Sequence, residues 1–193
     1  MILLRYGNTN TFYIPGRDGG LLVDTDYAGT LGAFYRALKE KALKLNDIAC
    51  VMATHYHPDH MGLIGALMEQ GVKLVLMDTQ REHVHFSDGI FARDALQFTP
   101  IDEAQASVVS CEESRAYFKR IGISGQIVPT PSHSPDSVSL ILDSGECIVG
   151  DLEPPEYIEA YENNEKLRGD WERIAAFRPK KICFAHMPAR EER

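Results

Sequence analysis

The sequence predicts an α+β fold in which helices cover the outer faces of β-sheets. Strand-like segments open the chain and later alternate with helical segments, and this order favours helices packed outside sheets. Hydrophobic residues make up 44% of the chain and charged residues 25%, as in globular proteins with a substantial core. The 193 residues are many for a minimal domain and few for two. We therefore expect one domain over residues 1–193.

Short apolar runs between turn-forming residues are the expected strands. The first two runs are joined through Pro15–Gly20, which is a hairpin signature, and a later pair is joined through Asp143–Gly145. The expected strands lie at residues 11–14, 21–23, 47–52, 72–77, 127–128, 138–142, 147–149 and 181–185.

Helices are expected where apolar residues recur at helical spacing and capping residues bound the segment. Gly71 is a favourable C-terminal cap, Ser110–Glu113 matches a capping box, and Gly122 ends the helix that this box opens. The expected helices span residues 30–44, 62–70, 110–122 and 171–177. The region 78–107 shows no pattern that assigns it to helix or strand.

The charge balance and the hydropathy pattern exclude several classes of partner. The formal net charge is −8 and the pI is about 5.3, whereas proteins that grip nucleic acid by its phosphates normally present a basic face. No apolar stretch approaches membrane-spanning length, and the run after Met1 is too short for a signal peptide. We therefore expect a cytoplasmic protein that binds neither nucleic acid nor membranes. Its oligomeric state does not follow from the sequence.

The four cysteines are not expected to form disulfides or to bind metal. None belongs to a C-x-x-C pair, and Cys50, Cys147 and Cys183 lie in strand-like apolar runs, where a free thiol behaves as a small hydrophobic group. This usage is consistent with a reducing compartment.

The string His55-Tyr56-His57-Pro58-Asp59-His60 follows directly after the buried run that ends at Ala53. Neutral imidazole and carboxylate are preferred ligands of divalent cations such as zinc, whereas a solvated loop gains nothing from clustering them. The string therefore predicts a metal site.

The spacing within this string indicates two metal positions. His55 and His57 point the same way in an extended segment, and Pro58 disfavours helical geometry at the residue before it. Asp59 and His60 are adjacent, so they cannot both share that direction in extended chain. We expect them to open the following helix and to face a second, neighbouring ion. Tyr56 should alternate away from the metals and pack in the core.

Three further ligand-type residues lie at expected strand ends. His133 occupies a polar turn before the strand 138–142, Asp151 ends the strand 147–149, and His186 ends the last strand. Loops gather at strand ends, so each can reach a common site. Any one of them alone is equally well explained as an ordinary polar strand end.

Taken together, these segments resemble the metallo-β-lactamase superfamily over nearly the whole chain. The resemblance rests on Asn10–Ile14 with Leu22–Asp26, on Thr54–His60, on Thr130–Ser139, on Gly150–Leu152 and on Ala185–His186. Ser132, Asp136 and Ala185 stand where that family usually has glycine. Asp136 is expected to tolerate a left-handed backbone, whereas Ser132 leaves the path of the His133 loop open.

The resemblance implies a four-layer αββα sandwich, two mixed β-sheets flanked by helices, with a dinuclear metal site at one edge. It implies that His55, His57 and His133 hold the first ion and that Asp59, His60 and His186 hold the second. Asp151 would bridge the two ions. This is a glyoxalase II-like ligand set, and the implied cofactors are two divalent ions, with zinc favoured and iron or manganese as alternatives.

The implied activity is metal-dependent hydrolysis. Two divalent ions about 3.5–4 Å apart lower the pKa of a shared water and create a bridging hydroxide. The hydroxide would attack a carbonyl or phosphoryl centre, and Asp59 is the candidate catalytic residue that handles the transferred proton. The site is expected to carry a net positive charge and to accept a small anionic or carbonyl-bearing ester, thioester, lactone or phosphoester.

Several surrounding residues are weaker candidates. Asp24 or Asp26 is expected to orient a ligating imidazole, with a plain turn aspartate as an equal alternative. His83 and His85 are expected to be surface histidines, with a substrate-facing loop as the alternative. The segment after Asp151 supplies further candidates for the mouth of the site, although solvated loop residues are the simpler interpretation. These candidates are Glu153, Glu156 and Tyr157.

Other members of the family compete as models for this chain. A mononuclear-iron persulfide dioxygenase shares a similar motif set and would use the His57 region, His133 and Asp151. A metal-binding or sensor protein without turnover is a third possibility. Glyoxalase II carries a C-terminal helical domain, and we expect none here because only seven residues follow His186. No cysteine falls at a ligand position, as it does in cysteine-containing zinc β-lactamases.

Overall fold

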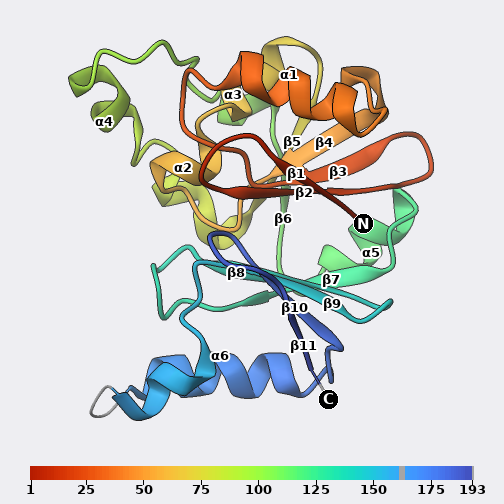
Figure 1. Cartoon of the computed structure of the whole chain (residues 1–193), viewed down its shortest axis with the longest axis vertical. Helices are drawn as coiled ribbons and strands as arrows, with labels where there is room; N and C mark the ends of the chain where they lie inside the picture. Colours follow the sequence, from red (N-terminus) through yellow and green to blue (C-terminus); the bar gives the residue numbers. More distant parts are fainter. Residues whose placement is uncertain (161–163, 193) are drawn as a thin grey trace.

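The computed structural model describes residues 1–160 and 164–192. Two mixed β-sheets lie face to face, and helices cover their outer faces (Figure 1). This arrangement confirms the predicted α+β class with four layers. Among the described residues, no helix is both long and apolar enough to cross a membrane.

The first sheet has six strands in the order β1-β2-β3-β4-β5-β6. Its first three strands pair antiparallel, and β3 to β6 pair parallel. These strands are β1 (Ile2–Arg5), β2 (Asn10–Ile14), β3 (Gly20–Val23), β4 (Ile48–Met52), β5 (Lys73–Met77) and β6 (Ser107–Val109).

The second sheet has five strands in the order β11-β10-β9-β8-β7. Only β9 and β10 pair parallel, and the other neighbours are antiparallel. These strands are β7 (Gly125–Pro129), β8 (Val138–Leu142), β9 (Glu146–Gly150), β10 (Lys181–Phe184) and β11 (Arg190–Glu191).

Helices α1 and α3 cover the first sheet, and α6 covers the second (Figure 1). The α-helices are α1 (Leu31–Glu40), α2 (Pro58–Met61), α3 (Ile64–Glu69), α4 (Asp88–Arg93), α5 (Ser114–Arg120) and α6 (Glu165–Ala175). The 3-10 helices are η1 (Leu45–Asp47), η2 (Asp78–His83), η3 (Glu103–Gln105) and η4 (Pro155–Ala160).

Strand alternation divides the core into three apolar layers. In β4, Val51 packs toward α1 and α3, whereas Cys50 and Met52 face the second sheet. In β8, Leu140 faces the first sheet and Ile141 faces α6. Successive side chains of a strand point to opposite faces, so a strand in the middle of four layers must be apolar on both. This requirement explains the uninterrupted apolar runs in the sequence.

Several element boundaries differ from those expected. Helix α1 ends at Glu40 and not at residue 44, because Ala42 adopts a left-handed conformation and Leu43 N–H donates to Leu38 O at 2.9 Å. No glycine marks this end. The helix expected at 62–70 is α3 at Ile64–Glu69, and a separate short helix, α2, precedes it at Pro58–Met61. Helix α6 begins at Glu165, six residues before Trp171, after an Asn164 cap.

Short edge strands were also missing from the expectation. The sequence pattern did not predict β1, β6 or β11, which have four, three and two residues. Such short strands carry too little alternation to be recognised. The caps at Gly71 and Gly122 were predicted correctly, because both glycines adopt positive φ where the expected helices end.

Candidate metal centre

The candidate site lies where the carboxyl ends of four strands meet. Strands β7, β9 and β10 run in one direction in the second sheet, so His133, Asp151 and His186 all follow their strands at the same edge. Strand β4 ends nearby in the first sheet and leads to His55 and His57. The backbone bond from Val138 N to Thr54 O, at 2.9 Å, ties the two sheets together at this point.

Four of the predicted ligands form a first half-site, His55, His57, His133 and Asp151, whose donor atoms lie within 4.8 Å of one another. The Nε2 atom of His133 lies 3.2 Å from His57 Nδ1 and 3.6 Å from Asp151 Oδ2. The Nε2 atom of His55 lies 3.9 Å from the same Asp151 oxygen. His57 has extended backbone angles and precedes α2, as the following proline predicted.

Asp59, His60 and His186 form a second half-site. The Nε2 atom of His186 lies 3.2 Å from Asp59 Oδ2, and His60 Nε2 lies 3.9 Å from Asp59 Oδ1. Asp59 and His60 both belong to α2, as expected from their adjacency.

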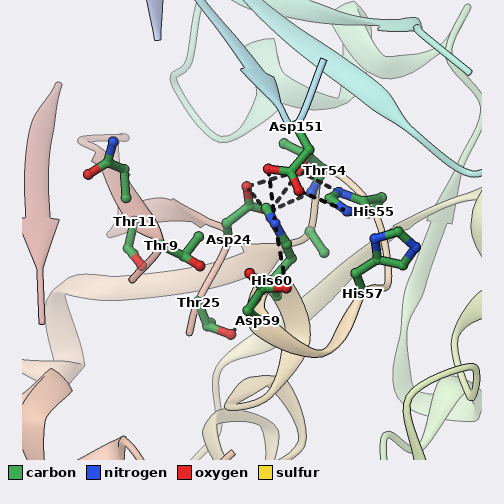
Figure 2. Close-up of polar contacts among 12 residues, drawn as sticks. Thr9, Thr11, Asp24, Thr25, Thr54, His55, His57, Asp59, His60 and Asp151 are labelled. Carbon is green, nitrogen blue, oxygen red and sulfur yellow. Dashed lines mark hydrogen bonds and ion pairs between the residues drawn. The ribbon is translucent and has the colours of Figure 1, made fainter. Parts of the chain in front are cut away.

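The two oxygens of Asp151 face different half-sites. Oδ2 is the oxygen near His55 and His133, whereas Oδ1 lies 3.3 Å from His60 Nε2 and 3.1 Å from His186 Nε2. Figure 2 shows Asp151, which follows β9 of the second sheet, facing His55 and His60, which follow β4 of the first sheet. The structure thus brings all seven predicted ligand residues together in two groups with Asp151 between them.

The donor atoms of the two half-sites are arranged to bind divalent cations and make few hydrogen bonds with one another. His55 Nε2, His60 Nε2 and Asp151 Oδ1 are buried and have no hydrogen-bond partner. An unpartnered buried polar atom is costly, so such a cluster calls for a ligand. Ligand atoms about 2.0–2.1 Å from one tetrahedral zinc ion lie about 3.3 Å apart. The distances of 3.1–3.9 Å between the donor atoms are close to that value.

Asp24 is the carboxylate that orients the buried imidazoles. Its Oδ2 lies 3.1 Å from His60 Nδ1, and it also accepts from the Thr54 hydroxyl at 2.9 Å (Figure 2). Because Thr54 Oγ1 donates its proton to Asp24, it can only accept from His55 Nδ1, which lies 3.3 Å away. Both contacts leave the Nε2 atoms free to face an ion.

Asp26 does not orient an imidazole. It accepts hydrogen bonds from the backbone amides of Tyr27, at 2.6 Å, and Thr9, at 3.3 Å. Of the two turn aspartates considered from the sequence, only Asp24 therefore contacts a predicted ligand.

The N-terminal hairpin holds the His186 loop. His186 Nδ1–H donates to the carbonyl of Asn8 at 3.2 Å, which directs Nε2 toward the second half-site. The Asn10 side-chain amide donates to Phe184 O at 2.9 Å and Met187 O at 3.0 Å. Asn8 and Asn10 carry no local pattern that would have revealed these roles.

Side chains replace the missing glycines in the His133 loop. Asp136 does not adopt positive φ; its carboxylate instead accepts from Tyr56 N at 2.7 Å and from the Ser134 hydroxyl at 2.8 Å. The tolerance of aspartate for a left-handed backbone is therefore not used at Asp136. The amide of Ser132 donates at 2.8 Å to the buried carboxylate of Asp170 on α6.

Gln80 joins the loops of both sheets. Its side-chain amide donates to the carbonyls of Ala53, Thr54 and Asp136 at 3.0–3.2 Å, and the residue is fully buried. Gln80 lies in the region that had no sequence assignment. A buried glutamine in a polar stretch has no sequence signal that separates it from an exposed one.

The surroundings of His55 favour its neutral form, whereas the carboxylates around His60 favour a positive charge at that position. Burial and the neighbouring histidines hold the pKa of His55 far below its ordinary value. Burial opposes charge on His60, but Asp24 and Asp151 outweigh it and raise its pKa to about 10. Burial raises the pKa of Asp151, and the facing histidines more than offset this, so its pKa is lowered. Burial lowers the pKa of His133.

Other predicted residues lie apart from the ligand atoms. His85 is exposed and pairs with Asp88 at 2.9 Å, and neither His83 nor His85 joins a group of three possible ligands among the described residues. Tyr56 is buried in the core, as predicted. The four cysteines are free, and Cys50, Cys147 and Cys183 are buried.

A small cavity of about 250 Å³ opens beside the two half-sites. Glu153 lines it, whereas Glu156 and Tyr157 do not, and Glu156 instead pairs with Arg190 at 2.8 Å. The lining residues are His133, Gly150, Asp151, Leu152, Glu153, Pro154, Phe184, His186 and Met187.

The chain is similar to a curated relative and to many solved structures. Beta-lactamase-like protein 2 homolog of Drosophila melanogaster is 26% identical over 190 residues. The match covers 95% of this chain and 60% of the relative, so the chain spans about 60% of that protein's length.

Three solved structures illustrate the likeness in fold. The BLEG-1 B3 metallo-beta-lactamase has a TM-score of 0.72 and 17% identity, over 98% of this chain and 93% of that one. TTHA1623 in a di-iron-bound form has a TM-score of 0.71 and 18% identity over the same shares. A metallo-beta-lactamase family protein from Thermus thermophilus has a TM-score of 0.66 and 19% identity, over 94% of this chain and 69% of that one.

The family follows from the match to a family model, because the structural likenesses alone show only the fold. The model of the metallo-beta-lactamase superfamily matches residues 4–186, which is nearly the whole chain and includes every predicted ligand. The resemblance inferred from the sequence motifs is thereby confirmed, and this protein belongs to the metallo-beta-lactamase superfamily.

Proposed function

We propose that this protein is a metal-dependent hydrolase with a dinuclear site. Its substrate would be a small ester, thioester, lactone or phosphoester. The observation that carries the proposal is the position of Asp151, whose two carboxylate oxygens face the two half-sites separately. A mononuclear site would leave Asp59, His60 and His186, which lie together on the other side of that carboxylate, without an ion to bind.

The proposed ligands are those expected from the sequence. His55, His57 and His133 would hold one ion and Asp59, His60 and His186 the other, with Asp151 shared. Two such ions polarise the oxygen of an electrophile and lower the pKa of a water held between them. Zinc suits the nitrogen and oxygen donors and is the favoured metal. Iron and manganese are the alternatives, and the di-iron-bound form of TTHA1623 supports iron.

Asp59 is the proposed proton acceptor. Its Oδ2 faces His186 Nε2 at 3.2 Å, whereas Oδ1 lies 3.9 Å from the nearest predicted ligand atom, His60 Nε2. Oδ1 is therefore the oxygen available to hold a proton. The side chain is 27% exposed, so that proton can pass to solvent.

The names of the relatives support hydrolysis without specifying a substrate. The Drosophila protein is named beta-lactamase-like, and BLEG-1 is described as a B3 metallo-beta-lactamase. A beta-lactamase hydrolyses the amide carbonyl of a lactam ring, and other carbonyl substrates are included in the proposal.

The test is a metal-quantified activity screen. Protein with measured zinc, iron and manganese content is assayed against ester, thioester, lactone and phosphodiester substrates. Asp151→Ala is compared with Asp143→Asn, an exposed carboxylate that pairs with Arg115 away from the site. We expect two equivalents of metal and turnover that Asp151→Ala abolishes and Asp143→Asn retains.

Two results would overturn the proposal. One is the absence of Asp151-dependent turnover in every substrate class at full metal loading. The other is a single equivalent of iron with oxygen uptake on a persulfide substrate, which would establish the dioxygenase alternative.

A further inference from the structure

We propose that the substrate is a neutral ester, thioester or lactone whose acyl group is apolar. This inference rests on the hydrolase function proposed above and narrows its substrate class. The sequence left open whether the substrate is anionic or only carbonyl-bearing. The side chains around the half-sites favour the second possibility.

An exposed aromatic side chain stands beside the first half-site. Phe86 is 58% exposed, and its ring centroid lies 5.6 Å from that of His57. It belongs to the turn between η2 and α4, whose backbone is held by a hydrogen bond from the Ser87 hydroxyl to Tyr56 O at 2.7 Å. An exposed phenyl ring next to a candidate ligand on an anchored turn is suited to cover an apolar substrate group.

A second exposed apolar side chain stands beside the other half-site. Met187 directly follows His186, is 38% exposed, and lines the cavity. Asn10 holds the Met187 carbonyl at 3.0 Å, so the backbone of this loop is also anchored. The flexible thioether of methionine adapts to varied apolar shapes. The two half-sites are thus flanked by one apolar side chain each.

The cavity itself is small and mainly apolar at its walls. Leu152, Pro154, Phe184 and Met187 contribute apolar surface to a volume of about 250 Å³. At about 30 Å³ for each water molecule, the cavity holds roughly eight waters, or a short acyl chain of similar size. A polymer or a large bicyclic substrate would have to extend outside it.

The charges around the cavity disfavour an anionic acyl group. No lysine or arginine is among its lining residues within the part of the chain that the structure describes, whereas Glu153 is. Recognition of a carboxylate or phosphate normally uses arginine or lysine. Arg190, on the neighbouring strand β11, is already paired with Glu156 at 2.8 Å and Glu192 at 3.3 Å. An anionic tail that extends past the two proposed ions would therefore meet Glu153 without a compensating lysine or arginine.

The test compares substrates that differ only in charge. The p-nitrophenyl ester of butyrate is compared with the p-nitrophenyl monoester of succinate, which has the same chain length and adds a carboxylate. Nitrocefin, a carboxylate-bearing β-lactam, and bis(p-nitrophenyl) phosphate complete the set. We expect kcat/KM for the butyrate ester to exceed each of the others at least tenfold.

Variants test the side chains that the inference names. In the natural protein, kcat/KM should rise from acetyl to hexanoyl esters by about three- to fourfold for each methylene that is buried. Phe86→Ala and Met187→Ala should each reduce this rise. Phe177→Ala is the matched control, because Phe177 is 40% exposed and lies just after α6, on the outer side of the second sheet, whereas Phe86 lies against His57. Glu153→Gln should raise kcat/KM for the succinate monoester selectively, at least threefold.

A binding measurement separates this inference from the proposed function. Saturation-transfer NMR with hexanamide and with adipate monoamide reports binding without turnover. We expect transfer to hexanamide only, reduced in Phe86→Ala and retained in Phe177→Ala.

Turnover and binding can fail separately. Asp151-dependent turnover that prefers the succinate monoester, nitrocefin or the phosphodiester would overturn this inference and leave the hydrolase intact. Equal binding of the two amides would also overturn it. Binding of hexanamide without Asp151-dependent turnover of any substrate would overturn the proposed hydrolase and keep the apolar acyl site.

Discussion

Asp24 Oδ2 lies 3.1 Å from His60 Nδ1, and both side chains are fully buried. Asp24 also adopts a left-handed backbone conformation with φ of 59° and accepts from Thr54 N at 2.6 Å. A non-glycine residue in that conformation is uncommon and is favoured for aspartate and asparagine. This strained turn places the Asp24 carboxylate against His60 Nδ1 and against the Thr54 hydroxyl, which in turn contacts His55 Nδ1.

Replacing Asp24 with asparagine should weaken metal binding without unfolding the protein. Asparagine tolerates positive φ and can still accept from Thr54 N, but it removes the charge behind His60 and replaces the acceptor that faces His60 Nδ1 with an amide N–H. We expect affinity for the second equivalent of metal to fall about 10- to 100-fold in chelator competition. Asp26→Asn is the control, since Asp26 contacts backbone amides only. Equal affinities in the two variants would show that Asp24 does not act through His60.

Replacing Asp170 should destabilise the His133 loop. Asp170 is 1% exposed and accepts from Ser132 N, so Asp170→Ala leaves a partly buried amide unpaired. We expect a loss of about 1–3 kcal/mol in the free energy of unfolding, measured with urea. Asp170→Asn keeps an acceptor and should recover most of the loss, whereas Glu172→Ala, on the exposed side of α6, should change little. A loss in Asp170→Asn as large as in Asp170→Ala would assign the effect to the ion pair with Arg173.

Removal of metal should lower thermal stability. An ion that binds only the folded state stabilises it by about 2.7 kcal/mol at one hundred times its dissociation constant. A chelator should therefore lower Tm, and added zinc should restore it in an amount that rises with the logarithm of the free zinc concentration. His85→Ala should retain this response, because His85 pairs with Asp88 outside both half-sites. A Tm that chelation leaves unchanged, with metal removal verified by elemental analysis, would contradict the proposed site.

Stability should fall in alkaline solution because of buried thiols. Burial raises the pKa of Cys50 from 9.0 to about 12, whereas an exposed thiol in the unfolded chain titrates near 8.5. Between these values the folded state binds more protons than the unfolded state, so stability decreases as pH rises. The contribution of one thiol is up to about 1.4 kcal/mol per pH unit.

The measurement is urea unfolding from pH 7.5 to 10.5. Cys50→Ala should show a shallower decline in the free energy of unfolding than the natural protein, whatever its stability at pH 7.5. Other buried thiols and the buried tyrosines titrate in both proteins and cancel in the comparison. Identical slopes would show that Cys50 does not contribute.

Local chemistry made much of the fold predictable from the sequence. Gly71 and Gly122 end helices because they adopt positive φ at little steric cost, and Pro58 holds His57 in an extended conformation. The end of α1 at Ala42 was not predictable in this way, since alanine carries no such signal. The short strands β1, β6 and β11 pair with neighbouring strands but have too few residues to show an alternating pattern of their own.

By itself, the sequence determined the family, the class of fold and the seven residues that the structure gathers. For His55 to His60 this depends on spacing over a few positions, where backbone geometry decides which side chains share a direction, whereas His133, Asp151 and His186 followed from the resemblance to the family's motifs. Only the tertiary structure decided that Asp24 and not Asp26 faces His60, and that Gln80, Asn8 and Asp170 support the ligand loops. It also placed Phe86 and Met187 beside the two half-sites. Contacts between segments far apart in the chain depend on how the sheets pack, and packing leaves no local pattern in the sequence.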